Sequence, residues 1–229
     1  ISACLVGSEM CIRDRYNINS ETLPSGRTYF TPDGDFPSIT TVLGKTANQA
    51  WLQAWREKVG EEEAQRISKL ATDRGTLIHE YAEKFFNDED IYGSLAKESL
   101  DVIQMTKDLI KEVEKGITEV WGQELVLWSK DLEFAGRTDM VGKWKNVPAI
   151  IDFKTSRKKK YVKQIKDYFI QCAAYAYAHN ELYETNIKKI IIVITVENNE
   201  PQIFETNALV HIPDLKYRIN QFYKLKLEK

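Results

Sequence analysis

The sequence predicts an α/β fold in which a central mixed β-sheet is flanked by helices. Helical periodicity dominates the first half of the chain, and the elements expected in the second half follow the order βββαββα. With 229 residues, of which 43% are apolar, the chain has the length and composition of one ordinary globular domain. Because no repeat, low-complexity tract or linker divides the series, we expect residues 16–229 to form a single domain.

The N-terminal half begins with a turn-rich stretch and continues as helices. Residues 16–34 are polar and end in a Pro-Asp-Gly sequence typical of a β-turn, so a short hairpin is expected. Ser38 is a suitable N-cap and Gly44 a suitable stop for a short helix. A second helix is expected over residues 47–58.

A long helix is predicted over residues 61–86, where apolar side chains recur near the helical period. Gly75 lies inside it, although glycine costs a helix about 1 kcal/mol relative to alanine. We therefore expect another segment to approach the backbone closely at Gly75. A further helix is expected over residues 94–115.

The second half begins with three short β-rich runs, residues 124–130, 133–143 and 149–155, which predict a three-stranded meander. Four elements then follow. We expect a helix over 161–182, a buried strand over 188–197, a strand over 202–206 that pairs back after a turn, and an amphipathic helix over 213–227.

The first fifteen residues, ISACLVGSEMCIRDR, are set apart from the rest. They lack an initiator Met and any periodicity, and they resemble a translated sequencing adapter, so residues 1–15 are excluded from fold reasoning as a probable non-native segment. Cys4 and Cys11 lie there, which leaves Cys172 alone and excludes a disulfide scaffold and a cysteine zinc site.

Charge and hydropathy narrow the classes of partner. A formal net charge of −2 gives no global attraction for a polyanion, so any nucleic-acid surface must be local. The longest strongly apolar run has seven residues, whereas a membrane-spanning helix needs about 20. We therefore expect no membrane segment, and with no recognisable signal sequence we expect an intracellular, cytoplasmic monomer.

Two aspartates and a lysine carry the most informative chemistry. Asp152 and Lys154 share one face of a predicted strand, and Asp139 on the preceding strand can reach that face. Converging carboxylates repel unless a cation lies between them, and hard oxygen ligands suit Mg²⁺ or Mn²⁺. A lysine there can activate water and offset charge on a phosphate, so the group indicates phosphodiester hydrolysis.

The alternative is a surface ion pair between Asp152 and Lys154, with Asp139 capping a turn. An Asp-x-Lys triplet alone is not specific, because the chain has another at Asp214-Leu-Lys216. That second triplet lacks both a preceding apolar strand and a partner aspartate one strand upstream, which favours the first as the functional one.

Further candidates lie on helices and on the first strand of the meander. Gln171 and Tyr175 are four residues apart on the helix after the lysine strand and could border the site, or could be a surface hydrogen bond and a core aromatic. His79 and Glu83 share a face of the long helix. Glu124, at the start of the first strand, could be an acidic ligand or an ordinary strand-edge charge.

These residues resemble the motifs of the PD-(D/E)XK nuclease superfamily, in its RecB-like branch. Asp139, Asp152-Phe-Lys154 and Gln171-x-x-x-Tyr175 match the core motifs, and the stretch from Arg74 through His79 to Glu83 resembles the helical histidine motif. Within the branch, the chain is most similar to the mitochondrial genome maintenance exonuclease group and its phage relatives. That similarity covers roughly residues 27–222 and rests on ordered motifs, PSITTVL at 37–43, WLxxWR at 51–56, GxxD at 136–139, IDFKTS at 151–156 and IIVIT at 191–195.

The resemblance implies a restriction-endonuclease-like core with an N-terminal helical arch over the site. It also implies a metal-dependent DNA exonuclease that prefers single strands with a free end. By this likeness Asp139, Asp152, His79 and Glu124 hold Mg²⁺ or Mn²⁺, Lys154 is the catalytic lysine, and Gln171 and Tyr175 support the site. Glu133 is the alternative to Glu124. No cysteine set is present for an iron–sulfur cluster.

A run of positive charge follows the lysine strand directly. Such a run is usually a solvated face, but beside a phosphodiester-cleaving lysine it indicates contacts to a DNA backbone. Tyr161, Tyr168 and Phe169 nearby could stack on unpaired bases or belong to the core. The residues expected to contact DNA are Arg157, Lys158, Lys159, Lys160, Lys163 and Arg74.

Two other functions stay open at this point. One is an endonuclease or resolvase on the same fold, which circular single-stranded DNA would distinguish from an exonuclease. The other is a nucleic-acid-binding protein that has lost activity. The complete set of Asp139, Asp152 and Lys154 argues against the second, since a dead site usually loses one member.

Overall fold

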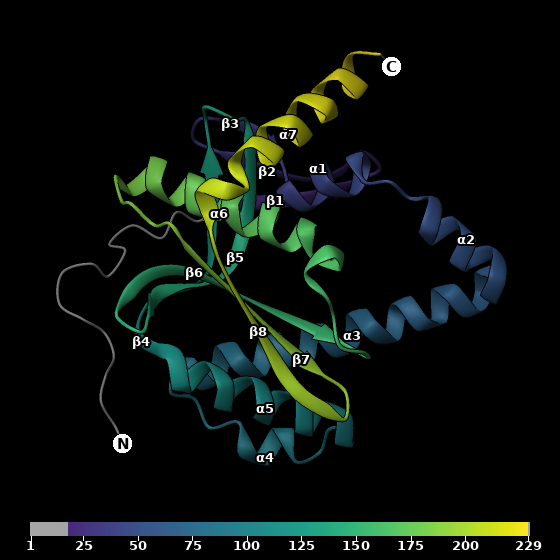
Figure 1. Ribbon diagram of the computed structural model, residues 1–229, viewed down its shortest axis with the longest axis vertical. Coiled ribbons are helices and arrows are strands. Elements are labelled where there is room, and N and C mark those ends of the chain that lie inside the picture. Colours follow the sequence, from purple (N-terminus) through teal and green to yellow (C-terminus); the bar gives the residue numbers. More distant parts are fainter. Residues whose placement is uncertain (1–17, 229) are drawn as a thin grey trace.

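The computed structural model describes residues 18–228. The segment 1–15 set apart above therefore lies outside the described residues, and the side chain of Trp51 is likewise not described. Figure 1 shows a small N-terminal sheet, a group of helices and a larger central sheet.

The N-terminal sheet has three antiparallel strands, β1 (Asn19–Leu23), β2 (Gly26–Thr31) and β3 (Gly34–Pro37). The predicted Pro-Asp-Gly turn joins β2 to β3. Helix α1 (Ile39–Thr46) follows, and Ser38 caps it as predicted, because the Ser38 Oγ accepts a hydrogen bond from the Thr41 N–H at 3.0 Å.

The predicted stop at Gly44 is wrong, since α1 continues to Thr46. A glycine can adopt helical dihedrals as easily as it can end a helix. Here a tertiary contact holds the last turn: the Arg218 guanidinium donates to the Leu43 carbonyl and to the Thr46 Oγ1, both at 2.5 Å.

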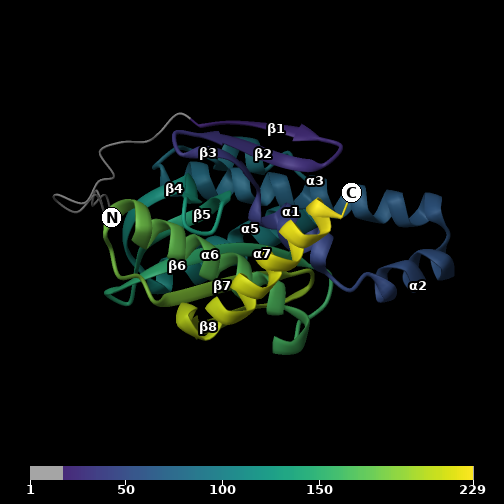
Figure 2. The ribbon, with the colours of Figure 1, turned by 90° about the horizontal axis from the view of Figure 1, so that it is seen from above.

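Helices α2 (Ala50–Val59) and α3 (Glu61–Phe86) form a hairpin that turns at Gly60, where φ is +86°. Both views of the ribbon show α2 and the beginning of α3 standing away from the rest of the molecule (Figures 1 and 2). Helices α4 (Tyr92–Leu95) and α5 (Leu100–Gly116) complete the helical half.

The central sheet has the strand order β4-β5-β6-β7-β8 and is mixed. Its strands are β4 (Ile117–Ser129), β5 (Phe134–Trp144), β6 (Val147–Ser156), β7 (Lys189–Val196) and β8 (Asn199–Asn207). The predicted meander β4-β5-β6 is confirmed, and α6 (Lys166–Tyr183) returns the chain so that β7 lies parallel to β6. After β8 the chain ends in α7 (Ile212–Leu227).

Strand β4 begins seven residues before the predicted start at Glu124, since it starts at Ile117. Two register shifts, between Ile117 and Glu119 and between Val120 and Gly122, interrupt its pairing with β5. Such irregularities remove the alternation of polar and apolar residues by which a strand is recognised in a sequence.

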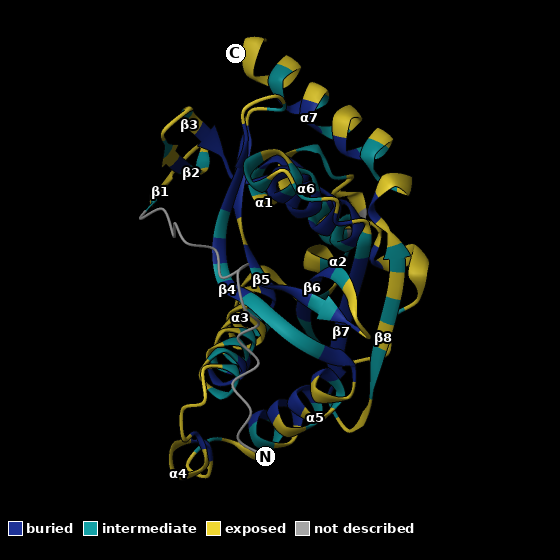
Figure 3. Ribbon diagram, turned by 90° about the vertical axis from the view of Figure 1, so that its left-hand side faces the viewer, coloured by how far each residue is buried: buried dark blue, intermediate teal, exposed yellow. Residues whose placement is uncertain are grey.

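Helices cover both faces of the central sheet (Figures 1 and 3). Ile190 and Ile192 of β7 pack with α1, α6 and α7, whereas Ile191 and Val193 pack with α3 and α5. Because both faces are buried, the strand reads as a continuous apolar run. Within residues 18–228, no helix has both the length and the apolar character that crossing a membrane requires.

Candidate active site

The site forms where strands β5 and β6 separate. Their backbone pairing ends at Met140 and Ile151. One residue further along β5, the Asp139 Oδ2 accepts a hydrogen bond of 2.7 Å from the Phe153 N–H. The carboxylate thus takes the place of a ladder carbonyl, which fixes Asp139 beside the part of β6 that carries Asp152 and Lys154.

Asp152 and Lys154 lie on the same face of β6, as alternation along a strand predicts. The Lys154 Nζ is 2.5 Å from the Asp152 Oδ2 and 5.3 Å from the centre of the Tyr168 ring on α6. Burial alone would lower the pKa of Lys154, but the carboxylates of Asp152 and Asp139 outweigh it and raise the pKa above its usual range. The lysine is therefore a fixed positive charge.

Asp152 is fully buried; its Oδ1 has no hydrogen-bond partner among the described residues, and its Oδ2 is held by the ion pair with Lys154. Burial raises its pKa to about 6; the Lys154 ammonium opposes this and the Asp139 carboxylate adds to it. A carboxylate oxygen without a donor in a protein interior is costly. A bound cation would satisfy the Asp152 Oδ1, which Lys154 leaves without a partner.

A second group of ligating atoms adjoins Asp139. One atom each from His79 of α3, Glu124 of β4 and Asp139 lies within 4.8 Å of the others. The His79 Nδ1 is 3.5 Å from the Asp139 Oδ1. Burial alone would lower the pKa of His79, but Asp139 reverses the effect and raises it. In Asp139, burial is likewise outweighed, and the His79 and Lys154 charges lower the pKa.

Glu124 enters this group through an unusual backbone conformation. It lies in β4 opposite Asp139 with a φ of +50°, a left-handed value that a glutamate rarely adopts. Burial raises its pKa to about 7, and the Asp139 carboxylate contributes. The alternative, Glu133, is exposed in the turn after β4 and lies apart from the cluster, so the geometry favours Glu124.

These side chains face a pocket of about 530 Å³ between the two helical layers. His79, Glu124 and Asp139 line it together with the predicted pair Gln171 and Tyr175, and the Gln171 Nε2 donates to the Tyr175 hydroxyl at 2.9 Å. Asp152 and Lys154 are not among the lining residues. Gly75 also borders the pocket; a Cβ there would lie 3.5 Å from the Thr155 Oγ1 of β6, an ordinary van der Waals contact, so β6 lies beside Gly75 without requiring a glycine there.

Two arginines line this pocket that were not predicted as site residues, Arg27 of β2 and Arg137 of β5. The Arg137 Nε is 2.7 Å from the Glu124 Oε2. Alternation along β5 places Arg137 on the face of Asp139 and could have indicated it. No local sequence pattern places Arg27 in this pocket, because the packing of the N-terminal sheet brings it there.

The residues predicted to contact DNA fall into two environments. The Arg74 Nη1 is 2.9 Å from Glu197 and 3.4 Å from Asp101, and only 11% of the side chain is exposed. Arg157, Lys158, Lys159 and Lys163 are exposed, and Lys160 is partly so. Contact with DNA stays a prediction for all six.

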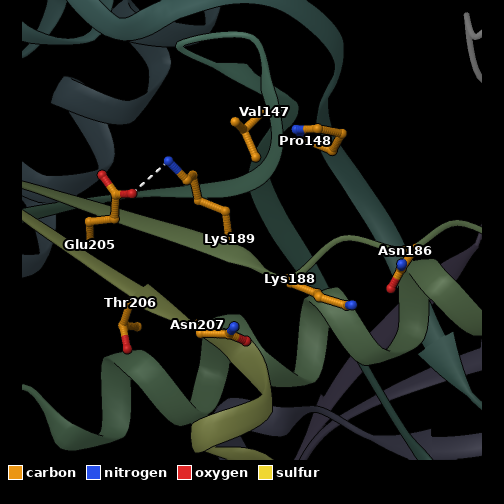
Figure 4. Close-up of a pocket in the computed structure, with 8 residues that line it drawn as sticks. All are labelled: Val147, Pro148, Asn186, Lys188, Lys189, Glu205, Thr206 and Asn207. Atoms are coloured by element: carbon orange, nitrogen blue, oxygen red, sulfur yellow. Dashed lines mark ion pairs between the residues drawn. The ribbon is translucent and has the colours of Figure 1, made fainter.

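A second pocket, also about 530 Å³, lies at the far end of β6 and β7 (Figure 4). The first residues of β6, the loop before β7 with the first residue of β7, and the end of β8 line it. The ion pair between Lys189 and Glu205 is its main charged feature. It contains none of the predicted site residues.

The ligands fit a divalent cation. Two carboxylates and one imidazole, those of Glu124, Asp139 and His79, converge. On the adjoining strand the Asp152 Oδ1 lacks a donor, and the raised pKa values of Glu124 and Asp152 reflect burial and concentrated negative charge. Carboxylate oxygens suit Mg²⁺ and Mn²⁺, and an imidazole is a better ligand for Mn²⁺ than for Mg²⁺.

A mixed sheet bears two aspartates and a lysine on adjacent strands, with a histidine and a glutamate beside them, an arrangement that suits a nuclease. The chain belongs to the PD-(D/E)XK nuclease superfamily, whose family model matches residues 45–221. Nucleases of this superfamily use divalent metal ions.

Relatives in animals are similar over most of the chain. Mitochondrial genome maintenance exonuclease 1 of Xenopus tropicalis is 24% identical over 214 residues, which are 86% of this chain and 60% of that protein. The Mus musculus protein of the same name is 23% identical over 176 residues, or 72% of this chain and 51% of that protein. This chain thus spans between half and three fifths of the length of these relatives.

Among solved structures, the crystal structure of "Putative exonuclease" from Eubacterium rectale is similar with a TM-score of 0.45 and 14% identity. The match covers 68% of each chain.

Proposed function

We propose that this chain is a Mg²⁺- or Mn²⁺-dependent exonuclease that hydrolyses single-stranded DNA from a free end. The observation that carries the proposal is the ion pair of a buried Asp152 with a charged Lys154 beside the His79, Glu124 and Asp139 cluster. The names of the relatives support the exonuclease class, and the ordered motifs support DNA as the substrate.

In this proposal Asp139, Asp152, Glu124 and His79 hold the ion. When bound, a divalent cation would neutralise charge on the phosphate and activate water for attack. Lys154 keeps a fixed positive charge close to the negative charge that develops on the phosphoryl group. Asp152 orients that ammonium. Gln171 and Tyr175 form part of the pocket wall against which the DNA strand lies.

We further propose that residues 16–229 act as one nuclease domain. The family match spans residues 45–221, and the N-terminal sheet contributes Arg27, Tyr29 and the adjoining Ser38 to the pocket. A domain without that sheet would lack one wall of the site.

The test is cleavage of an end-labelled linear single strand and a circular single strand, with Mg²⁺, with Mn²⁺ and with EDTA. We expect metal-dependent loss of the linear strand only. Lys154→Ala should lower kcat at least about a hundredfold, the usual effect of removing one charge-stabilising group. The matched control is Lys216→Ala, which removes the lysine of the second Asp-x-Lys triplet on α7 and should cut normally.

Cleavage of the circle would instead indicate an endonuclease. A wild type that binds the linear strand and cuts neither substrate with either metal would establish an inactive binding protein.

A further inference from the structure

The segment that joins β6 to α6, residues 157–165 and here named the basic loop, is fixed by side chains from both ends and from a distant strand. Gln202 of β8 makes two hydrogen bonds to the Lys160 backbone, with its Oε1 accepting from the N–H at 2.7 Å and its Nε2 donating to the carbonyl at 2.9 Å. The Ser156 Oγ donates to the Lys158 carbonyl at 2.6 Å, and the Gln164 Oε1 accepts from the Tyr161 N–H at 2.8 Å.

This fixed loop presents an aromatic ring to solvent. Tyr161 is 74% exposed, whereas Phe169 is 5% exposed and stacks on His211, and Tyr168 is partly buried against Lys154. Of the three aromatic residues that could stack on bases, Tyr161 is thus the one whose ring is available. Folding gains little from holding a tyrosine in this position, since its apolar area remains in water.

The charges around Tyr161 are also available. Lys158 and Lys159 are exposed and have no ion-pair partner among residues 18–228, and Arg157 approaches Glu197 only to 3.9 Å. Exposed cations interleaved with an exposed aromatic ring are the chemistry that binds an unpaired strand, with the cations on phosphates and the ring on a base.

The loop directly follows the strand that carries Lys154. Tyr161 follows Lys154 by seven residues, so at most about 25 Å of chain separates the two. Figures 1 and 2 show the segment between β6 and α6 on the side of the molecule from which α2 and α3 project. A DNA strand that enters between the α2–α3 hairpin and the central sheet would pass this loop.

We propose that the basic loop is a subsite for single-stranded DNA in which Tyr161 stacks on a base and Gln202 is the positioning residue that fixes the loop. This inference rests on the proposed function. It adds to that function a stacking residue, Tyr161, and a positioning residue, Gln202, which lies on the edge strand β8. Because one face of any base can stack, the subsite would hold a strand without selecting its sequence.

The first test compares binding of a fluorescent thymidine oligonucleotide with binding of an abasic oligomer of the same length, in EDTA so that neither is cut. Tyr161→Ala should weaken binding of the thymidine strand about tenfold, as expected for the loss of one stacked base. Binding of the abasic strand should not change. Tyr161→Phe keeps the ring and should bind as the wild type does.

The matched control is Tyr92→Ala, which removes a tyrosine of similar exposure, 65%, from α4, the helix at the bottom of Figure 1. It should leave both affinities unchanged. Equal weakening of both oligomers by Tyr161→Ala, or no weakening of either, would overturn the stacking role.

The second test addresses Gln202. Gln202→Ala should raise KM for the linear strand several-fold with kcat within about twofold of the wild type, and should weaken binding of both oligomers, because ring and cations lose their fixed positions together. The control Gln104→Ala removes an exposed glutamine of α5 whose Nε2 donates to the Asp108 Oδ1 of the same helix. A Gln202→Ala variant with the KM of the wild type would overturn the positioning role.

Failure of this inference is distinguishable from failure of the proposed function. If the wild type cuts linear strands and Tyr161→Ala has the affinity of the wild type, the subsite is wrong and the exonuclease stands. If the wild type neither binds nor cuts single strands, both are wrong.

Discussion

At the scale of single residues, Glu124 combines a strained backbone, burial and a like charge in Asp139. Each of these destabilises the fold, and each is typical of a residue retained for function. Replacement by an uncharged isostere should therefore stabilise the protein. In EDTA at pH 8, we expect Glu124→Gln to raise the free energy of unfolding by about 2 kcal/mol, the scale set by a carboxyl pKa near 7.

Metal should reverse the order of stability of the wild type and Glu124→Gln. Mg²⁺ or Mn²⁺ stabilises whichever protein binds it, so Tm of the wild type should rise with metal concentration and Tm of Glu124→Gln should rise much less. Thermal melts at several metal concentrations measure both effects without any substrate. Equal metal-induced shifts in the two proteins would remove Glu124 from the ligand set.

His179 makes stability sensitive to acid at a residue that the site does not use. Its ring is buried beside Tyr183, with Nδ1 2.7 Å from the Thr185 Oγ1, and the Nε2 has no hydrogen-bond partner among the described residues. Burial lowers its pKa to about 4. A histidine whose pKa is lowered by folding contributes stability above its unfolded value, about 6.5, and loses that stability as the pH falls towards 4.

We expect this residue to remove about 3 kcal/mol of stability between pH 7 and pH 4. Denaturant unfolding of the wild type and of His179→Phe across this range isolates the effect. The variant should be less stable at pH 7, because it lacks the hydrogen bond to Thr185. At pH 4 the difference in free energy of unfolding between the two proteins should vanish or change sign. Parallel curves would show that His179 does not titrate in this window.

At the scale of elements, Gly136 determines how closely α1 and α6 approach β5. A Cβ at Gly136 would lie 2.7 Å from the Tyr175 ring and 3.1 Å from the Ile39 side chain. Gly136→Ala should therefore cost about 1–3 kcal/mol through overpacking. It should also disturb the Gln171–Tyr175 hydrogen bond. Gly44→Ala is the matched control, since Gly44 has open space and lies within α1, where alanine stabilises by up to about 1 kcal/mol. Chemical denaturation should show a lower free energy of unfolding for Gly136→Ala and a higher one for Gly44→Ala. An unchanged free energy for Gly136→Ala would mean that the helices shift freely on the sheet.

How well an element could be predicted depends on whether local physics sets its ends. The long helix was predicted over 61–86 and occupies those residues, because apolar periodicity, acidic residues in its first turn and a glycine before it all agree. Helix α1 ends where Arg218 holds it, and β4 begins inside a stretch of irregular pairing. Contacts across about 170 residues of chain and shifts in register leave no local pattern to read.

At the scale of the whole molecule, the site residues also differ in whether local sequence or tertiary packing determines where they lie. Alternation in one strand places Asp152 beside Lys154, and the hairpin brings Asp139, so these three followed from the sequence. His79 reaches them because α3 packs on the sheet, and a resemblance to known motifs was needed to include it. Arg27 reaches the pocket because a separate sheet folds over it, and nothing in its local sequence indicates this.

The α2–α3 hairpin gives the molecule two parts of unequal stability. Between residues 52 and 73, Ala64 is the one buried residue, whereas Ile78, Tyr81 and Ala82 at the other end of α3 belong to the core. Helices shorter than about 12–15 residues are marginal without tertiary packing. The contacts of α3 with β6 begin near Gly75, opposite Thr155.

We therefore expect α3 to divide near Gly75 into a half that exchanges quickly and a half that is protected. Amide hydrogen exchange followed by mass spectrometry should show fast exchange over residues 50–72 and slow exchange over 78–86, and trypsin should cut first at Arg56, Lys58, Arg66 or Lys69. The division has a functional meaning, because the part that opens is the part that stands away from the sheet, while His79 stays on the rigid part. Uniform protection along all of α3 would contradict this and would make the hairpin as rigid as the nuclease core.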